Sequence, residues 1–139
     1  MRDRPFPFPR RRAKLPDVLR PTPDEPRGAS LSLRGAAGRL PALLLWPAVA
    51  DPGLLLFFGE DDAPAFELCA ELGVIVLAPQ HASFDDAVAA LEWAADHAAE
   101  LGAAGEELLV AGRYATALAA HARAQGWPPV EVHRPCAAH

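Results

Sequence analysis

Membrane-length hydrophobic runs, paired cysteines and phosphate-binding glycine loops are all missing from this 139-residue sequence. No apolar run approaches the roughly 20 residues that a membrane-spanning helix needs, and no apolar signal-peptide segment follows the basic N-terminus. Cys69 and Cys136 lie far apart without metal-ligand spacing, so we expect Cys69 to be a reduced core residue. The sequence therefore predicts a cytoplasmic protein with no membrane association, cofactor or metal.

Basic residues are concentrated at the N-terminus. Residues 1–28 contain eight of the 13 Lys and Arg side chains, four of the 18 acids and seven of the 15 prolines. The remaining residues have five basic and fourteen acidic side chains, an excess that argues against nucleic-acid binding as the main function. In the tail, Phe6 and Phe8 alternate with prolines, and Arg10, Arg11 and Arg12 follow. We predict a basic, proline-rich, disordered tail over residues 1–28 that folds back on its own acidic domain.

Beyond the tail, strand and helix patterns alternate. Periodicity and apolar runs predict strands at 30–34, 40–46, 53–58, 74–77, 107–111 and 130–133. The same analysis predicts helices at 62–72, 84–101 and 116–124. This order indicates one α/β domain over residues 29–135, a mostly parallel sheet of about six strands flanked by helices, with the 53–58 and 74–77 strands as neighbours.

Each predicted helix has an expected inner face and end signals. The first should bury Phe66, Leu68, Cys69 and Leu72 and end at Gly73. The second should begin after the N-cap Ser83, end at Gly102 and bury Phe84, Val88, Leu91, Ala95 and Ala98. We expect His97 and His121 on helix surfaces, and His133 facing outward from an edge strand.

The segment 77–102, LAPQHASFDDAVAALEWAADHAAELG, resembles the block that precedes the nucleophile in the hormone-sensitive-lipase-like branch of the α/β-hydrolases. The strand and turn LLVAGRYATA (108–117) then stand where this family has a strand followed by G-D-S-A-G. GRLPALLLWP, LLLFFGEDD and AHARAQGWPPVEVHRP match further family segments in the same order, so the resemblance covers about residues 29–135. It implies the N-terminal part of an α/β-hydrolase fold, truncated and degenerate, with esterase or lipase relatives.

The sequence departs from the family where the catalytic groups should be. Tyr114 occupies the serine position, and Phe58, Gly59, Glu60 and Asp61 occupy the H-G-G-G oxyanion loop. Two carboxylates in that loop oppose the stabilisation of a developing negative charge. The family's aspartate and histidine follow later strands, which we do not expect before His139. The resemblance therefore predicts a catalytically inactive domain that serves as a binding or interaction module.

Two alternatives remain open. Ser83 and His81 lie close in the sequence after a predicted strand, which would suit an ester hydrolase with displaced catalytic residues. The missing groups could instead come from a partner chain. We expect the edge of the last predicted strand, residues 130–132, to pair with a second copy or another chain.

Overall fold

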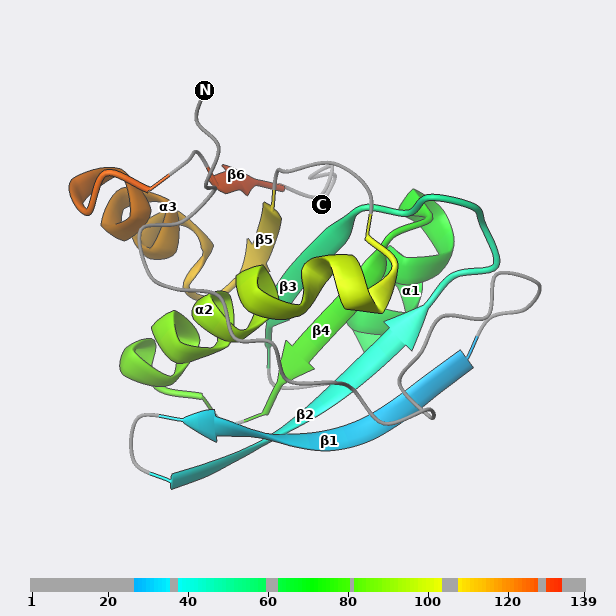
Figure 1. Ribbon diagram of the computed structural model, residues 1–139, viewed down its shortest axis with the longest axis horizontal. Helices are drawn as coiled ribbons and strands as arrows, with labels where there is room; N and C mark the ends of the chain where they lie inside the picture. The colour runs from blue at the N-terminus through cyan, green and yellow to red at the C-terminus, as the bar shows by residue number, and fades with distance from the viewer. Residues whose placement is uncertain are drawn as a thin grey trace.

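The computed structural model describes residues 27–35, 38–59, 63–80, 82–103, 108–127 and 130–133 (Figure 1). In chain order, the elements are β1 (Arg27–Gly35), β2 (Gly38–Trp46), β3 (Leu54–Phe58), α1 (Ala63–Leu72), β4 (Ile75–Pro79), α2 (Phe84–Leu101), β5 (Leu108–Gly112), α3 (Ala115–Ala124) and β6 (Val130–Val132). Because β1 begins at Arg27, the last two residues of the predicted tail belong to the sheet, and the rest of that tail lies outside the described residues. None of the described helices is long and apolar enough to span a membrane.

The strands form one six-stranded sheet in the order β1-β2-β4-β3-β5-β6. The β1–β2 and β2–β4 pairs are antiparallel, and the pairs from β4 through β3 and β5 to β6 are parallel. The two apolar strands predicted to be neighbours pair directly, with Leu54 opposite Ile75. The predicted α/β class, a mostly parallel sheet with helices packed on it, is confirmed.

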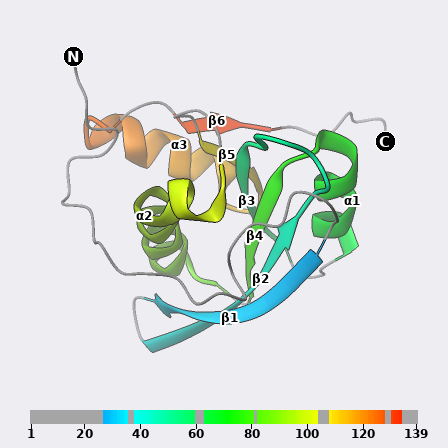
Figure 2. The same cartoon turned by 45° about the vertical axis from the view of Figure 1, so that its right-hand side comes forward.

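Helices cover both faces of the central strands. Figure 2 shows α2 and α3 together on one side of the sheet and α1 on the other. Because successive strand side chains point to opposite faces, Leu54 and Leu56 of β3 pack in the α2–α3 layer, whereas Leu55 packs in the α1 layer. All five residues of β3 are buried, as expected for a strand covered on both faces.

The buried stripe of α1 differs from the predicted one. Its inner residues are Ala65 and Cys69, one helical turn apart, whereas Phe66 is 54% exposed and Leu72 is 41% exposed. Small side chains on the inner stripe let the helix pack against the sheet, which turns the neighbouring Phe66 toward solvent. The prediction that Phe66 and Leu72 are buried was wrong, and the prediction that Cys69 is a reduced core residue is confirmed.

Helix α2 has the predicted ends, but its buried face is shifted. Leu91 and Ala95 are buried as predicted, whereas Phe84, Val88 and Ala98 are only half-buried against the core, so that part of the prediction was wrong. Ser83 is its N-cap, and Gly102 ends it with φ of 95°. His97, predicted to lie on the surface, is only 7% exposed, because it follows Ala90 and Ala94 along the inward stripe. Its Nδ1 donates to the Trp93 carbonyl at 2.9 Å, and the two rings stack with centroids 4.3 Å apart. The outward placement of His97 was therefore wrong.

Candidate functional site

The predicted strand, turn and helix around Tyr114 are present at the carboxyl ends of the parallel strands. β5 ends at Gly112, Arg113 and Tyr114 form the turn, and α3 begins at Ala115. Gly112 has φ of 94°, and a Cβ at this position would lie 2.1 Å from the Phe58 carbonyl oxygen. The Arg113 amide donates to that oxygen at 2.7 Å, so the turn is anchored directly to the end of β3.

The backbone of Tyr114 has negative φ. Its φ of −105° and ψ of 12° lie in the bridge region between the helical and extended conformations, and among the described non-glycine residues only Asp51 has positive φ. A nucleophilic serine in this type of turn sits on a sharp, strained backbone. The turn therefore retains the path of the chain from strand to helix, with Tyr114 in a negative-φ conformation at its apex.

Five rings form a continuous row at this edge of the sheet. Tyr114 makes edge-to-face contacts with Phe58, at a centroid distance of 6.0 Å, and with Phe84, at 5.9 Å. Phe84 also contacts His121 at 5.9 Å, and His121 contacts Trp127 at 5.5 Å. This aromatic row joins β3, the Tyr114 turn, α2, α3 and the short segment that follows α3 and contains Trp127. Pairs with this geometry are favourable beyond their buried area.

The aromatic row corrects the predicted place of His121. We expected His121 on an open helix surface, but it is half-buried between the rings of Phe84 and Trp127. Phe84 contacts both Tyr114 and His121, so its ring links the residue in the nucleophile position to the histidine on α3. Sequence reasoning missed this row because its members span 70 residues of chain and share no short motif.

The Ser83 side chain caps the N-terminus of α2. Its Oγ accepts from the Asp86 amide at 3.1 Å, and Asp86 Oδ2 accepts from the Ser83 amide at 3.2 Å. This reciprocal capping box satisfies amide donors at the start of α2. His81, the other member of the alternative pair, lies outside the described residues. The predicted N-cap is confirmed, and the proposed catalytic pairing stays a prediction.

The oxyanion-loop positions are only partly described. Phe58 is buried at the end of β3, with its ring in the aromatic row, and Gly59 follows it on the surface. A Cβ on Gly59 would lie 2.5 Å from the Phe57 ring, so the absence of a side chain is needed there. Glu60 and Asp61 lie outside the described residues. In the described part of the chain, no group of three His, Cys, Asp or Glu side chains could hold a metal ion.

His133 lies directly after β6 and is half-buried. Its amide donates to the Val110 carbonyl at 2.8 Å, the hydrogen bond that a parallel ladder makes at the Val110–Val132 pair. The predicted outward-facing edge histidine is therefore partly covered, and Glu131 is the exposed residue of this strand.

This sheet order, with a strand–turn–helix at the carboxyl edge, is the architecture of the first part of an α/β-hydrolase. The model superposes on an esterase from Pyrobaculum calidifontis with a TM-score of 0.62, at 23% identity over 75% of this chain and 42% of that chain. A thermophilic carboxylesterase cloned from a metagenomic library gives a TM-score of 0.65, at 21% identity over 72% of this chain and 42% of that one. A bacterial heroin esterase gives 0.63, at 23% identity over 81% of this chain and 45% of the esterase.

These likenesses show that the chain has the α/β-hydrolase fold, and they confirm the predicted resemblance at the level of fold. The chain spans less than half the length of these esterases. No protein-family model and no curated protein sequence matches it.

Proposed function

We propose that this α/β-hydrolase-fold domain does not hydrolyse esters and serves as a binding or interaction module. The observation that carries the proposal is the packing of Tyr114, the residue in the nucleophile position, into the aromatic row. Ester hydrolysis needs a nucleophile activated by an adjacent base, together with donors aimed at the developing oxyanion. Here a phenol ring takes the place of the serine side chain, and the Phe84 ring packs against it.

The direct test is turnover of a short-chain p-nitrophenyl ester by the full chain. We expect no turnover above buffer from the parent protein, from Tyr114→Phe or from Tyr114→Ser. Tyr114→Phe is the matched control, because it keeps the aromatic packing and removes the hydroxyl. Tyr114→Ser should lower the free energy of unfolding by about 1–3 kcal/mol through lost ring contacts. Turnover by the parent that Tyr114→Phe abolishes would contradict the proposal.

The alternative of a displaced site is tested at Ser83. Ser83→Ala should lower the free energy of unfolding by about 1 kcal/mol, because the cap is lost, whereas Ser83→Asn keeps a good cap without the hydroxyl. In the non-catalytic interpretation, both variants match the parent in the ester assay. Parent turnover that survives Tyr114→Phe and disappears in both Ser83 variants would establish the displaced hydrolase instead.

We also propose that the module pairs with a second copy or another chain through β6. In the described residues, β6 pairs with β5 on its inner side and with no strand on its outer side. The His133 amide points inward to Val110, so the alternation of a strand turns the Val132 amide outward. Exposed strand edges of this kind recruit partner strands.

Light scattering at tens of micromolar protein measures whether the chain associates through the β6 edge. We expect the parent to be a dimer, or to associate with its partner chain, and Val132→Pro to be monomeric because the outward donor is removed. Val132→Ala is the control that keeps the amide. If the parent is monomeric and gains no partner, or if Val132→Pro associates like the parent, β6 is not the interface.

A further inference from the structure

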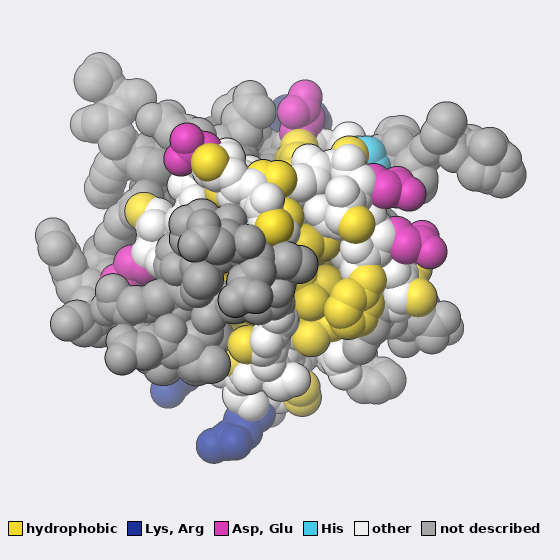
Figure 3. Space-filling model, turned by 90° about the vertical axis from the view of Figure 1, so that its right-hand side faces the viewer, with side chains coloured by type: hydrophobic (Ala, Val, Ile, Leu, Met, Phe, Trp, Pro, Cys, Tyr) yellow, Lys and Arg dark blue, Asp and Glu magenta, His cyan; other side chains and the backbone are white. Residues whose placement is uncertain are grey.

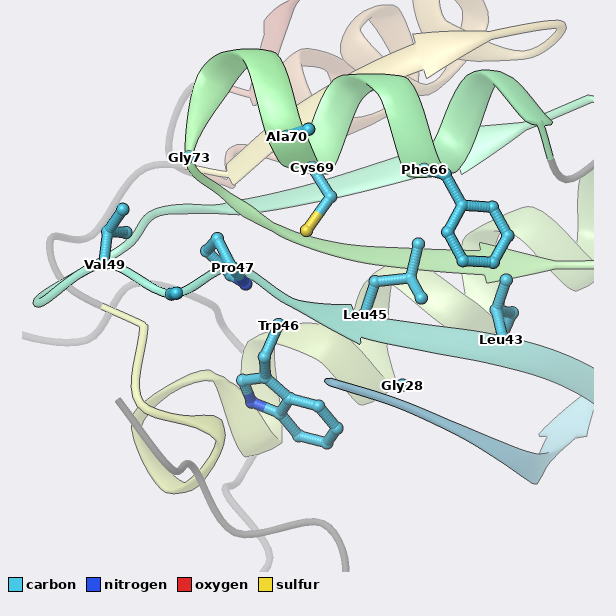
Figure 4. A pocket seen from close by; sticks show the side chains of 11 residues that line it. Gly28, Leu43, Leu45, Trp46, Pro47, Val49, Phe66, Cys69, Ala70 and Gly73 are labelled. Atoms are coloured by element: carbon cyan, nitrogen blue, oxygen red, sulfur yellow. The ribbon is translucent and has the colours of Figure 1, made fainter. Parts of the chain in front are cut away.

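An apolar groove lies between α1 and the end of β2. It has a volume of about 620 Å³, and its lining includes Gly28, Leu43, Leu45, Val49, Phe66 and Cys69. Figure 4 shows Phe66 and Cys69 of α1 on one side of this groove, facing Leu43 and Leu45 of β2 on the other. Burial raises the pKa of the Cys69 thiol, so this side chain presents a neutral, apolar surface.

The groove is separate from the Tyr114 turn. Leu45, Cys69 and Leu43 at the groove belong to the apolar layer under α1. Tyr114 instead packs against the layer of α2 and α3. The two features therefore lie on opposite faces of the sheet, and an inference about the groove does not rest on the proposed function.

Most of the large hydrophobic side chains that the described residues expose lie at the groove. Of the three large hydrophobic side chains that they expose, Phe66 and Val49 line it. Gly28 leaves the groove open from the β1 side, because a Cβ there would lie 2.9 Å from Leu45 Cδ2. Contiguous apolar patches on a small domain commonly mark interaction sites.

Acidic residues are the sequence neighbours of residues of α1 that line the groove. Glu67 and Glu71 are exposed on α1, next to Phe66 and Ala70, and α1 contains no basic residue. Figure 3 shows acidic side chains beside the hydrophobic patch on this face. Two like charges four residues apart destabilise a helix, so a basic partner would stabilise this one.

We propose that the groove binds the chain's own Pro5–Pro9 segment, with Arg10, Arg11 and Arg12 placed against Glu67 and Glu71. The 26 residues that precede β1 join the sheet at Arg27, and the next residue, Gly28, lines the groove. The occupant is thus tethered at its binding site, which gives it an effective concentration in roughly the millimolar range.

Pro-Phe-Pro-Phe-Pro favours an extended polyproline conformation without internal hydrogen bonds, the form that aromatic-lined grooves recognise.

Limited trypsin digestion of the full chain tests this docking, with cleavage after residues 10–14 followed by mass spectrometry. We expect slow cleavage in the parent and cleavage about tenfold faster or more in Phe6→Ser/Phe8→Ser, because the anchoring rings are lost. Val18→Ser/Leu19→Ser is the matched tail control and should cleave like the parent. Synthetic peptides of residues 1–20 with the same substitutions give the rate of the unprotected segment.

A second pair of matched variants tests the groove itself. Phe66→Ala should accelerate cleavage about tenfold, whereas Leu72→Ala, an exposed residue of the same helix outside the groove, should not change it. A parent that is cleaved as fast as the free peptide, or a Phe66→Ala rate equal to that of Leu72→Ala, would overturn the proposal. Protection that grows between about 1 and about 100 µM protein would overturn it too, because the occupant would then be the tail of a second copy.

Discussion

Gly112→Ala should lower the free energy of unfolding by about 3 kcal/mol or more, a large fraction of the stability of a small domain. The new Cβ would lie 2.1 Å from the Phe58 carbonyl oxygen and within 3.0 Å of two other backbone atoms of that residue. The positive φ of 94° adds strain for any L-residue. Because Phe58 and Gly112 are opposite each other on β3 and β5, relief would require these central strands to move apart.

Urea denaturation provides the measurement, and Gly126→Ala provides the control. Gly126 also has positive φ, 76°, but nothing lies within 4 Å of its missing Cβ. Its replacement should therefore cost only the backbone strain, about 1–2 kcal/mol. Equal losses for the two variants would show that the β3–β5 contact at Phe58 is not as close as described.

Leu55→Ala and Leu56→Ala should each lower the free energy of unfolding by about 2–5 kcal/mol. The two residues are adjacent in β3, so their side chains point to opposite faces of the sheet. Both are fully buried, Leu56 in the layer of α2 and α3 and Leu55 in the layer of α1. Each truncation leaves a cavity, and tight packing on both sides limits collapse around it.

The control for this pair is Leu72→Ala, the same chemical change at a residue that is 41% exposed. We expect it to cost less than about 1 kcal/mol in the same denaturation experiment. If Leu55→Ala behaved like Leu72→Ala while Leu56→Ala remained costly, α1 would not cover its face of the sheet.

Part of the candidate site could be predicted from the sequence. The apolar strand, the glycine and the helix-forming stretch around Tyr114 predicted the turn, because each signal concerns residues close together in the chain. Its altered chemistry was also visible, since the residue in the serine position is a tyrosine whatever surrounds it. The aromatic row could not be predicted, because contacts between distant elements produce it.

The sequence by itself determined the local elements of this protein and both ends of its longest helix. Short-range physics set the Ser83 cap, the stop at Gly102 and the fully apolar strand β3. The tertiary structure alone decided that His97 is buried, that Phe66 lies exposed at a groove, and that Phe84 contacts both Tyr114 and His121. The physical reason is that periodicity identifies one face of an element, whereas burial depends on which neighbours pack against it and how closely their side chains allow them to approach.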